Sequence, residues 1–287
     1  MFLFFQSVLS AGDHVIVQTP CYQSALSVPR GIGCDVTEWP CRYEHRWQPD
    51  LEELERAFRP TTRALYINSP HSPTGFHFSR AAFDQILALA DARGVIVFSD
   101  EVYRELEYDP DLRLPPACDL SDLAVSLGVM SKTYGLPGLR IGWIATRNRQ
   151  VLHAVARAKD YTTICNSAPS EYLAELALRH RTQLVERNLG IVRSNLTVLD
   201  GFFTRYGHVL QWVRPRAGSV AFPRLVARLG SAEFCANLVA RSGVLLAPGE
   251  TFGRPGHVRI GAGRLNMHEA LAGLEEYLRE TEPLPRG

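Results

Sequence analysis

The first half of the chain alternates short runs of β-branched residues with longer amphipathic stretches. The stretches 51–58 and 80–93 carry apolar residues at helical spacing, and Gly94 ends the second of them as a helix C-terminal stop. This alternation is typical of an α/β fold with a largely parallel sheet. The predicted strands lie over 14–18, 34–37, 64–67, 95–98, 124–127 and 139–144.

From about Val151 the hydrophobic pattern changes to long helical segments with short strand-like pieces between them. We therefore expect a three-layer αβα large domain over 1–162. A smaller α+β C-terminal domain, which includes the interdomain helix, is expected over 163–287. The predicted helices of this second part lie over 151–158, 170–205 and 267–279, and the predicted strands over 219–222, 244–246 and 257–260.

Composition and charge narrow the classes of partner. Lys and Arg number 31 against 30 Asp and Glu, and no long run of one sign occurs, which argues against a nucleic-acid or membrane surface. The six cysteines are scattered, without the Cys and His spacing of a zinc site, so we expect reduced thiols, no metal and a cytoplasmic protein. Small molecules are the expected partners.

Polar side chains follow three of the predicted strands. Asp100 follows one strand, the polar turn 68–75 follows another, and Lys132 follows a third. In open α/β sheets ligands bind beyond the carboxyl ends of the strands, so we expect these groups to share one edge. Each feature alone is weak, because a carboxylate after a strand is commonly a helix cap and Ser-Pro-Thr-Gly is commonly a turn. Their order along the chain makes them informative.

In that order the motifs resemble those of the class I/II aminotransferase family, fold-type I enzymes that use pyridoxal 5'-phosphate (PLP). The turn 72–75 (Ser-Pro-Thr-Gly) is similar to the family's Asn-Pro-Thr-Gly, and 100–103 is similar to its Asp-x-x-Tyr. Lys132 with Arg140 resembles its lysine and phosphate-binding arginine. Arg259, which follows a Pro-Gly-x-x-Phe-Gly motif, resembles the arginine that binds the substrate carboxylate. The resemblance covers nearly the whole chain.

The resemblance implies a role for each of these residues. Lys132 would form the Schiff base (aldimine) with PLP and then act as the base that moves the substrate Cα proton. Asp100 would keep the pyridine nitrogen protonated, since a nearby carboxylate favours the charged form. The remaining implied contacts are Tyr103 and Ser72 with the 3'-oxygen, Ser131 and Arg140 with the phosphate, Tyr22 with the face of the ring, and Arg259 with the substrate α-carboxylate.

Three departures from the family pattern weaken this cofactor site. Ser72 is shorter than the usual Asn, and Val129 stands where relatives often carry a phosphate-binding Ser or Thr. Family members also carry an N-terminal segment before the residue that corresponds to Met1. We therefore expect an edge strand and a phosphate loop to be missing, and the strand at 139–144 to expose unpaired backbone.

The leading hypothesis is an aminotransferase that moves an α-amino group between an amino acid and a 2-oxo acid. The same scaffold hosts β-elimination, cyclisation, oxidation and decarboxylation, so another PLP reaction stays open. A third possibility is a catalytically silent module for ligand binding or dimerisation, because the phosphate site is incomplete. The resemblance also implies a homodimer.

Overall fold

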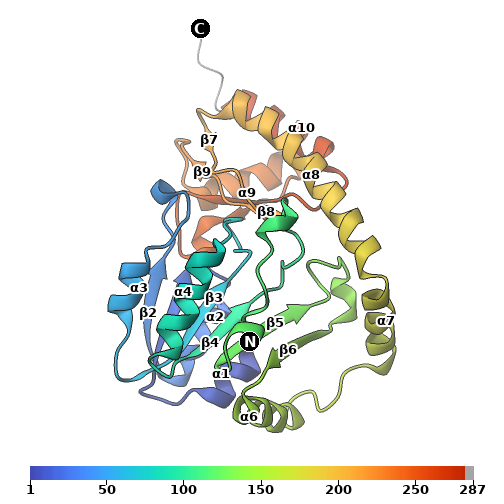
Figure 1. Cartoon of the computed structure of the whole chain (residues 1–287). Coiled ribbons are helices and arrows are strands. Elements are labelled where there is room, and N and C mark those ends of the chain that lie inside the picture. The colour runs from blue at the N-terminus through green and yellow to red at the C-terminus, as the bar shows by residue number, and fades with distance from the viewer. Residues whose placement is uncertain (282–287) are drawn as a thin grey trace.

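The computed structural model describes residues 1–281, which build a central six-stranded sheet (Figure 1). The strand order is β2-β1-β3-β4-β5-β6, with parallel pairing throughout except for β6, which is antiparallel to β5. A mostly parallel sheet is therefore confirmed. The strands are β1 (His14–Thr19), β2 (Asp35–Pro40), β3 (Thr62–Asn68), β4 (Ile96–Asp100), β5 (Ala124–Val129) and β6 (Gly142–Thr146).

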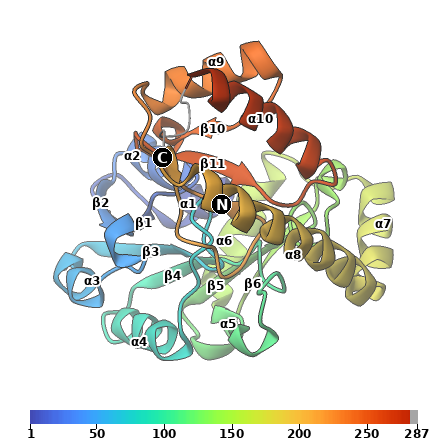
Figure 2. The ribbon, with the colours of Figure 1, turned by 90° about the horizontal axis from the view of Figure 1, so that it is seen from above.

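Helices cover both faces of this sheet, as the two views in Figures 1 and 2 show. Successive side chains of a strand point to opposite faces, so Val97 joins the apolar cluster under one helical layer and Phe98 joins the cluster under the other. The three-layer αβα arrangement is confirmed. One layer comprises α1 (Phe2–Val8), α2 (Ser24–Ile32) and α6 (Arg149–Asp160), and the other α3 (Leu51–Ala57), α4 (Arg80–Asp91) and α5 (Ala117–Leu120).

The rest of the chain forms an α+β unit whose core is made by facing helices. The long α8 (Arg181–Tyr206) packs against α9 (Ser231–Ser242) and α10 (Met267–Thr281). Phe222 and Phe252 from this part also enter the apolar cluster of the α3 and α4 layer. The remaining elements are α7 (Ala168–Arg179), β7 (Leu210–Gln211), β8 (Val220–Ala221), β9 (Arg224–Leu225), β10 (Ala247–Pro248) and β11 (Val258–Gly261).

The predicted division of the chain at residues 162 and 163 stays a prediction. The C-terminal unit was expected to reach residue 287, of which 282–287 lie outside the described residues. Within it, β8, β11 and β10 form a small antiparallel sheet, and β7 pairs with β9.

Three element predictions need correction. The strand expected at 139–144 begins only at Gly142, because Pro137–Leu139 form a 3-10 turn and Arg140 is left-handed, with φ 55°. The helix expected over 170–205 is two helices with a break at His180. The strand expected at 244–246 is wrong, since β10 starts at Ala247.

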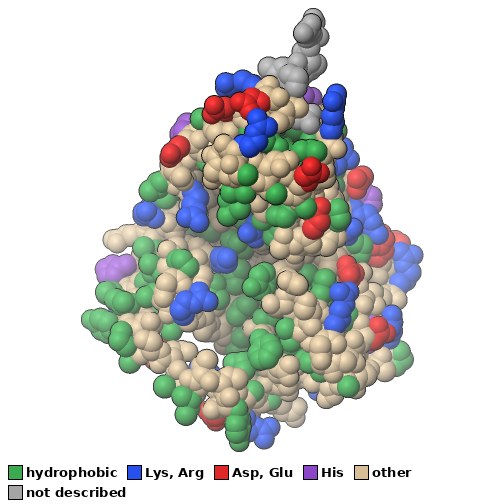
Figure 3. Space-filling view, turned by 180° about the vertical axis from the view of Figure 1, so that it is seen from behind, with side chains coloured by type: hydrophobic (Ala, Val, Ile, Leu, Met, Phe, Trp, Pro, Cys, Tyr) green, Lys and Arg blue, Asp and Glu red, His purple; other side chains and the backbone are tan. Residues whose placement is uncertain are grey.

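The predicted exposed edge is confirmed at β6. Within the described residues β6 pairs with β5 alone, and Trp143 is 38% exposed. A hollow of about 260 Å³ beside this strand is lined by residues that include Gly128, Trp143 and Ala145. Figure 3 shows hydrophobic side chains gathered on the lower half of the rear face. Within residues 1–281, no helix combines the length and apolar character needed to cross a membrane.

Candidate active site

Asp100 ends β4 and places a buried carboxyl group at the carboxyl edge of the sheet. Its Oδ2 accepts a hydrogen bond from the Tyr66 hydroxyl at 3.1 Å, and its Oδ1 accepts one from the Val102 amide at 3.3 Å. Burial raises the pKa of Asp100, and these two hydrogen bonds oppose that rise because they favour the charged form. The carboxyl group is therefore fixed through both oxygens.

Lys132 lies beside this carboxyl group, in the turn that follows β5. Its Nζ is 6.0 Å from the centroid of the Tyr103 ring. Partial burial lowers the pKa of Lys132, the charge of Arg259 lowers it further, and the charge of Asp100 opposes both effects. The structure thus brings together the acid and the lysine that the sequence placed after different strands.

Tyr103 and Ser72 meet at the same site. Burial raises the pKa of Tyr103, while the charge of Arg259 and a hydrogen bond with Ser72 oppose the rise. The Ser72 amide donates to Asn68 Oδ1 at 2.7 Å, and Asn68 Nδ2 donates to the Asp100 carbonyl at 2.7 Å. Asn68 therefore couples the turn that carries Ser72 to the strand end that carries Asp100.

Arg259 reaches this site from the C-terminal part of the chain. It lies in β11, and its guanidinium carbon is 4.9 Å from the centroid of the Phe252 ring. Its positive charge acts to lower the pKa of both Lys132 and Tyr103. A cation held close to the lysine can bind an anionic group that approaches the same point.

The residues expected around the phosphate are less buried than Asp100 and Tyr103. Ser131 is half-buried, and Arg140 is exposed with its guanidinium donating to the Pro137 carbonyl at 3.0 Å. Arg140 still lies close enough to lower the pKa of Lys132. Tyr22 is 64% exposed in the turn between β1 and α2.

Two polar residues that were not predicted from the sequence hold the turn that carries Lys132 in place. The Thr133 hydroxyl lies 3.0 Å from the Val102 carbonyl and 2.8 Å from the Arg104 carbonyl, and Asn188 Nδ2 donates to the Thr133 carbonyl at 2.9 Å. Thr133 is adjacent to the lysine and so could have been suspected. Asn188 lies on α8, 55 residues further along the chain, where no local pattern marks it.

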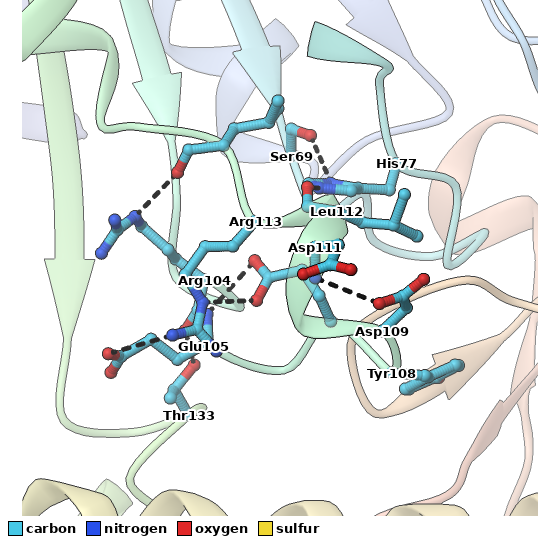
Figure 4. A network of polar contacts seen from close by, with 12 residues as sticks. Ser69, His77, Arg104, Glu105, Tyr108, Asp109, Asp111, Leu112, Arg113 and Thr133 are labelled. Carbon is cyan, nitrogen blue, oxygen red and sulfur yellow. Dashed lines mark hydrogen bonds and ion pairs between the residues drawn. The ribbon is translucent and has the colours of Figure 1, made fainter.

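The turn after Tyr103 is supported by a network of charged groups (Figure 4). Arg113 Nε donates to the buried carboxylate of Glu107 at 3.1 Å, and the Glu105 amide donates to the other oxygen of that carboxylate at 3.2 Å. Glu105 is left-handed, with φ 76°. This network therefore fixes an unfavourable backbone conformation two residues after Tyr103.

The sequence matches the family model described as aminotransferase class I and II over residues 1–273. The chain belongs to this family. It is 31% identical to capreomycidine synthase of Streptomyces vinaceus over 280 residues, an alignment that covers 97% of this chain and 72% of the synthase.

Two solved structures extend the comparison. A PLP-dependent aminotransferase from Streptococcus suis superposes with a TM-score of 0.92 at 34% identity, covering 98% of this chain and 74% of that one. The PLP-dependent cyclase OrfR superposes with a TM-score of 0.89 at 33% identity, covering 97% of this chain and 75% of that one. The fold is therefore that of fold-type I PLP enzymes.

Proposed function

We propose that this chain is a PLP-dependent aminotransferase that moves an α-amino group between an amino acid and a 2-oxo acid. The observation that supports this most is the meeting of Lys132, Asp100, Tyr103 and Arg259 at the carboxyl edge of the sheet. Membership of the family gives PLP as the cofactor. When bound, PLP supplies an electron sink for the charge that develops at the substrate Cα.

The residues present fit the ring side of this cofactor. Asp100 offers a buried carboxyl group for the protonated pyridine nitrogen, and Tyr103 with Ser72 offers two hydroxyl groups for the 3'-oxygen. Tyr22 would cover the face of the ring. Ser131 and Arg140 would hold the phosphate, the guanidinium through paired charge-assisted bonds.

Lys132 would carry the proton transfer. Its lowered pKa leaves more of the amine neutral than in an ordinary lysine, and only a neutral Nζ can take a proton from the substrate Cα. Arg259 would bind the substrate α-carboxylate and so restrict substrates to amino and oxo acids. Binding at Arg259 also brings the Cα close to Nζ, which favours the reaction through proximity.

The lysine assignment has a direct test because the chain contains only two lysines, Lys132 and Lys159. Lys159 lies on α6 and donates to Thr163 Oγ1 at 2.8 Å. We expect borohydride reduction of the PLP-loaded chain, followed by digestion and mass spectrometry, to place the cofactor on Lys132. The visible absorption band should be lost in Lys132→Ala and kept in Lys159→Ala. A band that persists in Lys132→Ala would contradict the assignment.

A second candidate is another PLP reaction on an amino acid, with cyclisation foremost. Two of the relatives are named as a synthase of capreomycidine and as a cyclase, and Ser72 replaces the usual asparagine beside the 3'-oxygen. Single amino acids incubated with the PLP-loaded chain separate the two candidates. Conversion of the amino acid to its 2-oxo acid supports amino transfer. Release of ammonia or CO₂, or a cyclic product, without any 2-oxo acid would defeat it.

We also propose, from the family resemblance, a cytoplasmic homodimer. Sedimentation of the PLP-loaded chain tests the oligomeric state. A chain that shows no PLP absorption band and turns over no amino acid would instead support the catalytically silent module for ligand binding or dimerisation.

A further inference from the structure

Tyr66 is a polar exception on an apolar face of the sheet. Its buried neighbours on this face, Val15, Val17, Ala64, Ile96 and Phe98, are hydrocarbon. Tyr66 itself is 1% exposed, and its ring stacks on Phe98 with centroids 6.2 Å apart. A phenylalanine would fill nearly the same volume, so packing alone does not explain the hydroxyl group.

The hydroxyl group of Tyr66 donates to Asp100 Oδ2 at 3.1 Å. A buried hydroxyl costs free energy unless it is hydrogen-bonded, and a bond to a carboxylate is stronger than one between neutral groups. The strand register makes the contact, because Tyr66 lies opposite Phe98, two residues before Asp100, with both side chains on one face.

We infer that Tyr66 is a positioning residue for the proposed reaction, whose hydroxyl group keeps the Asp100 carboxylate ionised and held in one orientation for the cofactor ring nitrogen. The inference rests on the proposed function. Tyr66 acts through Asp100 and not on the substrate. Burial and the neighbouring Asp100 raise the pKa of Tyr66 well above its ordinary value, so the phenol stays a donor throughout the working range of pH.

Other ionisable groups also face this pair. The Met1 amino group and Lys132 act on Asp100 with positive charge, and Cys21 lies near Tyr66. Burial raises the pKa of Cys21 to about 12, so its thiol is neutral. Within the described residues, Tyr66 alone among these groups makes a side-chain hydrogen bond to the Asp100 carboxylate.

The first test uses the cofactor-free chain and therefore does not depend on activity. We expect Tyr66→Phe to move the ¹³C NMR titration midpoint of the Asp100 carboxyl to higher pH, because the anion loses a donor. Tyr206→Phe, which removes the hydroxyl of a buried tyrosine on α8, should leave that midpoint unchanged. An unchanged midpoint in Tyr66→Phe would overturn the inference, whatever the chain catalyses.

The second test uses the PLP-loaded chain. We expect Tyr66→Phe to weaken PLP binding by about tenfold, the scale of one charged hydrogen bond, and to shift the pH at which the absorption spectrum changes. When Tyr66→Phe is added to the Asp100→Asn variant, it should neither weaken PLP binding further nor shift the spectral change. A loss of thermal stability without a spectral shift would reduce Tyr66 to a packing residue and overturn its role.

Two further outcomes keep the inference and the proposed function distinguishable. In one outcome, Tyr66→Phe shifts the titration midpoint of the Asp100 carboxyl but the wild-type chain binds no PLP. The proposed function then fails, and with it the role of Tyr66 in that reaction, although the contact between Tyr66 and Asp100 is supported. If Tyr66→Phe does not fold, the ¹³Cζ resonance of Tyr66 in the wild-type chain gives the answer. Its chemical shift should change over the same pH range as that of the Asp100 carboxyl. A chemical shift that changes independently of the Asp100 carboxyl would overturn the inference.

Discussion

Asp100 and Glu101 are neighbours in the sequence, but their carboxyl groups serve different parts of the molecule. Asp100 contacts Tyr66 near the lysine, whereas Glu101 accepts hydrogen bonds from the Ala117 amide at 2.9 Å and from Ser126 Oγ at 2.7 Å. Glu101 thus holds the start of α5. The motif in the sequence predicted the carboxylate that lies near Lys132, and the alternation of side chains along the strand explains why its neighbour points elsewhere.

The buried Asp100 carboxyl should make the stability of the cofactor-free chain depend on pH. Burial raises its pKa in the folded chain above the unfolded value of 3.8, so the folded chain binds more protons than the unfolded chain just above that pH. The free energy of unfolding should therefore fall as pH rises through this window. Asp100→Asn should remove that part of the decline and leave the chain more stable at pH 7.

Urea unfolding of the cofactor-free wild type and Asp100→Asn between pH 4 and pH 7 measures this difference. Asp122→Asn is the matched control, because the Asp122 side chain is 83% exposed and should change the pH profile little. Parallel profiles for the wild type and Asp100→Asn would show that burial of Asp100 does not control the pH dependence.

At the scale of elements, the turn that carries Ser72 is held against the C-terminal part by a glycine. Gly75 has φ +70°, and its carbonyl accepts from the Arg216 amide at 2.8 Å. A Cβ added at Gly75 would lie 2.2 Å from Pro215 Cβ and 2.9 Å from the Val220 carbonyl oxygen. The close approach therefore requires glycine at this position, beyond its role in the turn.

Gly75→Ala should consequently destabilise the fold by about 3 kcal/mol or more, because left-handed strain and a backbone collision add. The control is Gly190→Ala in α8, where an added Cβ meets no heavy atom within 4 Å. That change should stabilise the chain by about 0.5–1 kcal/mol, since alanine favours the helix. Thermal unfolding of both variants checks the prediction, and equal melting temperatures would refute the close contact.

Hydrophobic periodicity predicted the five parallel strands well because they are short and three of them, β1, β3 and β4, are buried on both faces. The prediction failed where the backbone departs from regular helix or strand geometry, because the spacing of apolar residues does not show such departures. Arg140 adopts a left-handed conformation that delays β6, and His180 interrupts a helical pattern that is otherwise continuous. Residues 244–246 are β-branched or apolar but pair with no strand within residues 1–281, whereas the next two residues pair with β11.

At the scale of the whole molecule, the candidate site is assembled from segments far apart in the chain. Motifs identified Lys132, Asp100 and Arg259, since each lies in a recognisable local context. Tyr66 and Asn188 escaped notice because their contacts depend on how β3 and α8 pack, which only the folded chain specifies. Local sequence therefore predicted the chemical groups, and tertiary packing supplied their supports.

Arg259 offers a test of this assembly, because it comes from β11 and not from the central sheet. Arg259→Lys keeps the charge but loses the paired donors that match a carboxylate. We expect KM for the amino acid to rise by roughly 10- to 100-fold, on the scale of 1.4–2.8 kcal/mol, while the absorption spectrum of bound PLP stays the same. Arg264→Lys, an exposed neighbour, is the control. Loss of the PLP spectrum in Arg259→Lys would place this arginine at the cofactor instead.

The small number of lysines also determines how the protein can be labelled chemically. With two lysine side chains and the amino terminus as its only primary amines, the chain offers few points of attachment for amine-reactive dyes or surface-coupling chemistry. The lowered pKa of Lys132 makes its amine a better nucleophile at neutral pH than an ordinary lysine. Conventional immobilisation or fluorescent tagging would thus modify the proposed Schiff-base lysine, so handles on thiols or on the carboxyl terminus suit this protein better.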